Sequence, residues 1–164
     1  GTCGGFRSSG NKNKQRCLEL DITLPSVAEE CYLTQGKNTR LYWSHMQEAG
    51  INLASLTVVD GCPFRGPFYQ LLRQYLLAAF FRQSETVDEV NIASVAFRGN
   101  RSLHQVPPYL KKLGDTVISA WNRGLIGVPE LRHIEVEDIV DAMKTDKSDT
   151  ARSLVNYLND RYGL

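Results

Sequence analysis

Long apolar runs are absent from this sequence: no stretch approaches the roughly 20 residues that a membrane-spanning helix needs. The first 16 residues also lack the apolar segment of a secretory signal, so we expect an intracellular, cytoplasmic protein with no membrane association. The four cysteines, at positions 3, 17, 31 and 62, form no C-x-x-C pair and no tight cluster with histidine. Reduced thiols are therefore expected in preference to a disulfide framework.

Several enzyme motifs are missing as well. The sequence has no G-x-x-x-x-G-K-[ST], G-x-G-x-x-G, G-x-S-x-G or H-E-x-x-H, so nucleotide-cradling and zinc-protease interpretations lose their usual support. Charge of one sign is not in excess: the net charge is +1, and any nucleic-acid surface must be a local patch. With 164 residues and 42% apolar residues, the chain is ordinary for a globular protein with its own core.

The amino-terminal residues differ in composition from the rest. Residues 1–16 are rich in Gly, Ser, Asn and Lys and contain no acid, which predicts a flexible basic arm. Residues 17–164 are predicted to form a single domain without internal repeats. Because the chain opens on Gly1 and not on Met, we expect a fragment or a processed chain.

Residues 67–83, PFYQLLRQYLLAAFFRQ, predict an amphipathic helix. Pro67 suits the first helical position, where its missing N–H would be unpaired anyway. Apolar residues at three- and four-residue spacing predict one buried face, made of Phe68, Leu71, Leu72, Tyr75, Leu76, Ala79 and Phe80. Gln70, Arg73 and Gln74 lie close to that face, which indicates a partner for them, either internal or a ligand.

Alternation of apolar and polar residues predicts a strand at residues 17–24. The other predicted elements are a short helix at 27–31, a helix at 41–49, a strand or apolar connection at 51–59, a buried strand at 90–97, a helix at 109–121 broken near Gly114, an edge strand at 133–136, a helix at 137–143, and a last helix from Ser148 or Asp149 to about Tyr162. Strands that alternate with helices favour an α/β or α+β fold.

Two carboxylates, Glu19 and Asp21, would point to one face of the strand at residues 17–24. Such a pair can hold a divalent cation, because hard cations prefer oxygen ligands, and Asp60 could add a third ligand. The alternative is a half-exposed strand that shows its acids to water.

Cys62 lies in the turn DGCPFRGP, where the dipole of the following helix could stabilise a thiolate. A histidine at position 45, 104 or 133 could serve as its base, as in a cysteine-dependent hydrolase or transferase. A buried structural cysteine is the favoured interpretation.

Elsewhere Arg98 and Arg101 follow a predicted strand, which fits either a phosphate-facing patch or a solvated loop.

The order of elements resembles the PD-(D/E)XK nuclease superfamily over roughly residues 17–144. LELDIT, at residues 18–23, resembles the E-x-K strand of that superfamily, and YQLLR, at residues 69–73, resembles the helix motif that follows it. The strand at 90–97 would be the next core strand. The pattern departs at Asp21, where the superfamily has lysine, and no acid precedes it in residues 1–16.

This resemblance implies a restriction-endonuclease-like α/β fold with a central mixed β-sheet flanked by helices. It implies a metal-dependent nuclease that acts on or binds nucleic acid phosphodiesters, with Mg²⁺ as cofactor. By the resemblance Glu19 falls at the metal-binding acid, and Gln70 and Arg73 reach toward the active face. Together with the carboxylate pair and the basic stretch this gives our hypothesis for the site: Glu19, Asp21 and Gln70 in catalysis, Glu19, Asp21 and Asp60 at the metal, and Arg73, Arg98 and Arg101 at the substrate. Three interpretations stay open: an active nuclease with a migrated lysine or a missing amino-terminal portion, a degenerate one that binds without cutting, or an accidental likeness.

A second class of function is a non-catalytic interaction module or a subunit of a larger assembly, with a protein partner or a homodimer. It predicts an exposed apolar patch on the last helix or on residues 41–49. The third class is the cysteine-dependent enzyme centred on Cys62.

Overall fold

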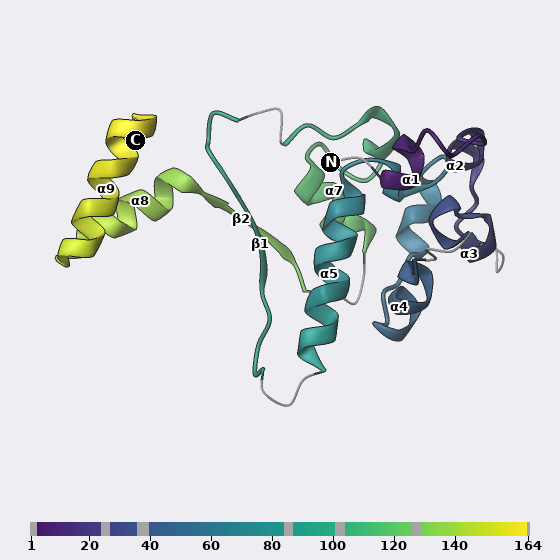
Figure 1. The fold of residues 1–164 in the computed structure, drawn as a ribbon, viewed down its shortest axis with the longest axis horizontal. Helices are drawn as coiled ribbons and strands as arrows, with labels where there is room; N and C mark the ends of the chain where they lie inside the picture. Colours follow the sequence, from purple (N-terminus) through teal and green to yellow (C-terminus); the bar gives the residue numbers. More distant parts are fainter. Residues whose placement is uncertain are drawn as a thin grey trace. The chain divides into compact units, whose positions relative to one another are not determined.

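A computed structural model describes residues 3–23, 27–35, 40–83, 87–100, 104–125 and 129–163. In these ranges the protein is rich in helices and has one small sheet, in which β1 (Ile92–Ala96) pairs with β2 (Leu131–Glu135) in parallel (Figure 1). The chain divides into two compact units, one of Gly1–Ile92 with His104–Leu131 and one of Ala93–Leu103 with Arg132–Leu164. A mixed α and β composition therefore agrees with the predicted class, while the described ranges contain no larger central sheet.

The first unit is made of short helices and one long helix. Its elements are α1 (Gly4–Arg7), α2 (Gln15–Glu19), α3 (Val27–Glu30), α4 (Tyr42–Glu48), α5 (Phe68–Arg82) and α7 (Val117–Gly124), with 3-10 helices η1 (Tyr32–Thr34), η2 (Ala54–Val58), η3 (Pro63–Arg65) and η4 (Pro108–Leu110). None of the described helices is both long enough and apolar enough to cross a membrane.

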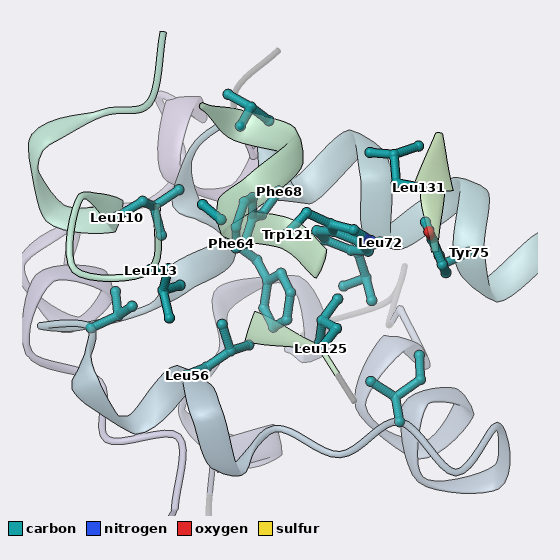
Figure 2. Close-up of a cluster of buried hydrophobic side chains, with 14 of the residues drawn as sticks. Leu56, Phe64, Phe68, Leu72, Tyr75, Leu110, Leu113, Trp121, Leu125 and Leu131 are labelled. Atoms are coloured by element: carbon teal, nitrogen blue, oxygen red, sulfur yellow. The ribbon is translucent and has the colours of Figure 1, made fainter. Parts of the chain in front are cut away.

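Helix α5 organises the core of the first unit. It begins after Pro67, whose φ of −61° already suits a helix, which confirms the long helix predicted there. The Trp121 ring of α7 packs edge-on against Phe68, with 5.1 Å between ring centroids, and lies 4.9 Å from the Tyr75 ring. Figure 2 shows this aromatic group at the centre of the buried cluster. Aromatic pairs of this geometry add stabilisation beyond their buried area.

The buried face of α5 differs in part from the prediction. Phe68, Leu72 and Tyr75 are buried as expected, and Ala78 joins them. Phe80 was expected on this face, but 69% of its surface is exposed, so that part of the prediction is wrong. Helical periodicity identifies a face, but how far along the helix this face is covered depends on neighbours distant in sequence.

The second unit is built on the two strands and two terminal helices. Strand β2 continues directly into α8 (Val136–Thr145), and α8 packs beside α9 (Asp149–Tyr162), as Figure 1 shows in yellow-green and yellow. Ser148 caps α9 by accepting a hydrogen bond from the Ala151 N–H at 3.2 Å, as predicted. The Phe97 ring lies 5.6 Å from that of Tyr162, which ties the end of β1 to α9.

The strand predicted at residues 17–24 is wrong in the residues that the structure describes. Residues 15–19 form α2, and the Asp21 carboxylate accepts hydrogen bonds from Thr23, which makes a turn. Leu18 is exposed and Leu20 is buried, so the leucines do not share one face. The alternating sequence predicts hydrogen bonds to a neighbouring strand. The Cys17 carbonyl instead accepts hydrogen bonds from the Cys62 N–H and the Arg65 guanidinium. Glu19 and Asp21 are consequently not neighbours on a strand face.

Other local predictions are mostly confirmed. The helices predicted at 27–31, 41–49 and 137–143 appear as α3, α4 and α8, and the strands predicted at 90–97 and 133–136 appear as β1 and β2. Within β1 only Ile92 and Ala96 are buried, so the expectation of a fully buried strand is wrong. Residues 54–58 form a 3-10 helix and not a strand. The helix predicted at 109–121 is divided into η4 and α7, with the break at the expected place.

The predicted amino-terminal arm contains structured residues. Cys3, Gly5 and Asn11 are buried, and the Asn11 side chain donates to the Gly5 carbonyl at 3.0 Å. The arm's boundary at residue 16 and the single domain of residues 17–164 stay predictions.

Candidate functional site

The turn at residues 60–67 joins the amino-terminal helices to α5. The Cys62 N–H donates to the Cys17 carbonyl at 2.9 Å, and the Arg65 guanidinium donates to the carbonyls of Cys17 and Asp60 at 3.3 and 2.7 Å. Gly61 has φ +73°, and a Cβ there would collide with the Leu18 carbonyl. The segment that carries Asp60 is therefore held against the segment that carries Glu19.

The three candidate metal ligands are exposed carboxylates. Glu19 accepts a hydrogen bond from Gln15 at 2.6 Å, and Asp60 lies 3.6 Å from the Lys112 ammonium. Two hydrogen bonds from Thr23 lower the pKa of Asp21, so this carboxylate is ionised at neutral pH.

The positions of these carboxylates do not by themselves make a closed ion site. Across the described ranges, no group of three or more His, Cys, Asp or Glu side chains is placed to hold a metal ion. Glu19, Asp21 and Asp60 come from adjoining segments without gathering at one point, and their role as ligands stays a prediction.

Gln70 and Arg73 form a polar pair one turn apart on α5. The Arg73 guanidinium donates to the Gln70 side-chain carbonyl at 3.1 Å and lies 5.9 Å from the centre of the Tyr69 ring. The Tyr69 hydroxyl is 3.2 Å from the Tyr42 hydroxyl of α4, and burial together with this contact raises the pKa of Tyr69. Gln70 and Arg73 thus share one exposed surface, where both can reach a ligand.

Arg98 follows β1 and is surrounded by carboxylates at the end of β2 and the start of α8. Its guanidinium pairs with Glu135 and, at 3.0 Å, with Asp138. Its backbone N–H donates to both carboxylate oxygens of Glu137 at 3.0 Å. The hydrogen bond from the Arg98 backbone N–H is the main reason that the pKa of Glu137 is lowered. A nucleic-acid phosphate would have to compete with these carboxylates for Arg98. Arg101 lies outside the described residues.

Sequence reasoning missed the contact between Arg65 and Tyr109. The guanidinium lies 3.9 Å from the ring centre, a cation–π distance. The buried Tyr109 hydroxyl has no hydrogen-bond partner among the residues that the structure describes, and burial raises its pKa to about 12. A Cβ at Gly66 would collide with this hydroxyl. No sequence signal links residues 65 and 109, although the acids of EVED directly after a predicted strand could have pointed to the partners of Arg98.

Cys62 does not have the environment of a reactive thiol. It is buried, and burial raises the pKa of its thiol, whereas a nucleophilic cysteine needs a lowered pKa. The favoured interpretation of a buried structural cysteine is in agreement with this environment.

The chain was also compared with known proteins. A family model described as Restriction Endonuclease associating with ARP matches residues 10–163. No curated protein and no solved structure gives a significant match. The match covers all the candidate residues discussed for this site, and it supports a restriction-endonuclease-like family without showing a PD-(D/E)XK motif.

Proposed function

Since the chain belongs to the family Restriction Endonuclease associating with ARP, we propose that it is a nuclease-like domain that acts on or binds nucleic acid phosphodiesters. The observation that carries this proposal is the family match over residues 10–163, which includes most of both compact units. The proposal includes a restriction-endonuclease-like core, a central mixed β-sheet flanked by helices, to which β1 and β2 would contribute.

The proposed cofactor is Mg²⁺, with Glu19, Asp21 and Asp60 as its ligands. Carboxylate oxygens suit this hard cation. The hydrogen bond from Cys62 to Cys17 supports the set because it holds the Asp60 segment against the Glu19 segment. The bound ion would act as a Lewis acid toward phosphate. The described side chains do not form a closed site for the ion.

The chain's own contribution to binding would be positive charge and hydrogen-bond donors. Arg73, held by Gln70 at 3.1 Å, is oriented to meet a phosphate oxygen, because guanidinium groups match phosphate geometry. Arg98 would exchange a carboxylate for phosphate, and Arg101 is proposed as a second phosphate contact. Contacts of this kind position nucleic acid without reading its sequence.

Calorimetry with Mg²⁺ and Mn²⁺, together with plasmid cleavage on the same samples, tests the proposal. Glu19→Ala should abolish metal binding and cleavage. Glu48→Ala is a matched control, because Glu48 is likewise an exposed glutamate at the last position of a short helix. Absence of both metal binding and cleavage in the wild type would reject the metal-dependent nuclease. If such a protein still bound DNA, only the domain that binds nucleic acid without cutting it would remain.

The second candidate is a protein-interaction role, which the family's description as associating with ARP favours. A hollow of about 300 Å³ lies between α4 and α5, and its lining includes the exposed side chains of Leu77 and Phe80. The patch was predicted on residues 41–49 or on the last helix, whereas Leu77 and Phe80 belong to α5 and only the other side of the hollow, at His45, Glu48 and Ala49, falls in residues 41–49. Phe80→Ser should weaken copurification with an ARP partner without a change in thermal stability, whereas unchanged copurification would remove this surface from the proposal.

A further inference from the structure

All four cysteines of the chain line one hollow in the first unit. The lining of this hollow includes Cys3, Cys17, Cys31 and Cys62. They come from four separate segments, since Cys17 lies within α2 and the other three immediately precede α1, η1 and η3. All four are free thiols.

Backbone hydrogen bonds hold these segments together. The Cys62 N–H donates to the Cys17 carbonyl at 2.9 Å, and the Cys3 N–H donates to the Arg65 carbonyl at 3.3 Å. Close packing of α1 on η1 brings in the Cys31 segment, and a Cβ at Gly5 would lie 2.9 Å from the Leu33 Cγ. The convergence of the thiols is therefore built into the backbone of the unit.

We propose that Cys3, Cys17, Cys31 and Cys62 bind one Zn²⁺ ion as a four-thiolate structural site. Zn²⁺ in structural sites takes four ligands in a tetrahedron, and four cysteines are a common set. The open space of the hollow is about 20 Å³, close to the volume that one water-sized probe occupies. This space suits a single ion and not a multi-iron cluster. The site is separate from the proposed nuclease function, since it uses none of the candidate carboxylates.

Positive charge is at hand. Four thiolates around Zn²⁺ carry a net charge of about −2, and Arg16 and Arg65 both line the hollow. Arg16 is paired with Glu30 at 2.9 Å, whereas within the described part of the chain the Arg65 guanidinium contacts carbonyl oxygens and the Tyr109 ring. Arg65 would therefore contribute most to balancing the charge of the site.

Binding requires the cysteine side chains to move from their positions in this structure. Within the described part of the chain, no three metal-ligating side chains stand close enough together to hold an ion, so the sulfurs surround the hollow without meeting in it. Rotation of the cysteine side chains would bring the sulfurs inward. Zinc would then fasten the amino-terminal residues to the turn before α5, and its binding energy would add to folding.

The test begins with wild-type protein purified under reducing conditions without chelators. Elemental analysis should find about one zinc per chain. Removal of the zinc should lower the melting temperature and make the thiols reactive toward Ellman's reagent. Added Co²⁺ should then produce thiolate-to-cobalt charge-transfer absorption. Absence of Zn²⁺ and Co²⁺ binding by the reduced protein would overturn the proposal, as would iron with acid-labile sulfide or the isolation of two disulfides.

Variants add a second readout. Cys17→Ser should weaken zinc affinity by at least about 100-fold, because loss of a ligand exceeds the usual effect of its supporting groups. Asp21→Asn is the control: its zinc content should equal that of wild type, even if nuclease activity is lost. Zinc lost in Asp21→Asn but retained in Cys17→Ser would place the ion elsewhere. Since the wild-type measurements need no variant, a misfolded Cys17→Ser does not weaken the test.

Discussion

The backbone N–H of Cys62 donates to the carbonyl of Cys17 over 2.9 Å, and this bond joins the turn before α5 to helix α2. Arg65 donates to the same carbonyl at 3.3 Å. Glu19 and Asp60 each lie two residues from one of the bonded cysteines, so the same joint positions the candidate carboxylates and the cysteine hollow. Its geometry can be disturbed selectively at Gly61.

Gly61→Ala should destabilise the first unit by at least about 2 kcal/mol, because the new Cβ combines a left-handed backbone with a collision against Leu18. Gly50→Ala is the matched control. Gly50 has a similar φ of +67° but open space around it, so its cost should be only about 1 kcal/mol. Urea unfolding measures the free energy of unfolding of both variants. Equal losses in Gly61→Ala and Gly50→Ala would show that the contact with Leu18 is unimportant.

Trp121→Ala should cost about 3–5 kcal/mol, the range for removal of a fully buried aromatic side chain. Trp121 packs against both Phe68 and Tyr75, so its loss opens a cavity beside α5. Phe81→Ala, at a half-exposed aromatic of α5, should cost less than half as much. Chemical denaturation followed by circular dichroism compares the two, and similar losses would contradict the position assigned to the core.

Thr116→Ala should destabilise α7 by about 1 kcal/mol, because it removes a reciprocal capping box with Ser119. Thr57→Ala, which removes only an exposed hydrogen bond to the Ala54 carbonyl, is the control and should have a smaller effect. Thermal unfolding measures both variants. A neutral Thr116→Ala would mean that packing of Trp121 holds α7 without its cap.

Glu137 should make the second unit sensitive to acid. Its folded pKa lies below its ordinary value of 4.5, mainly because the Arg98 N–H donates to the carboxylate. The stabilisation is therefore present above pH 4.5 and is lost as the pH falls through the folded pKa. Glu137→Gln should unfold earlier than wild type at pH 7, and the difference should shrink at lower pH. A difference in Glu137→Gln that is constant with pH would refute this account.

Local sequence determined much of the helical structure. The spacing of apolar residues and Pro67 predicted α5, and Ser148 predicted the start of α9, because periodicity and capping act between residues a few positions apart. The strand at β1 was predicted for the same reason. At residues 17–24 the local pattern was misleading, since alternation stabilises a strand only when a neighbouring strand supplies the hydrogen bonds.

Contacts between distant segments were decided only by the tertiary structure. The exposure of Phe80, the stacking of Arg65 on Tyr109 and the carboxylates around Arg98 depend on residues far apart in the chain. The cysteines show the difference most directly. Their spacing in sequence indicated four unconnected thiols, but the hydrogen bond between Cys62 and Cys17 and the packing of α1 on η1 bring them to one hollow. Sequence patterns report which face of an element is apolar, whereas the partner of that face is chosen when the whole chain packs.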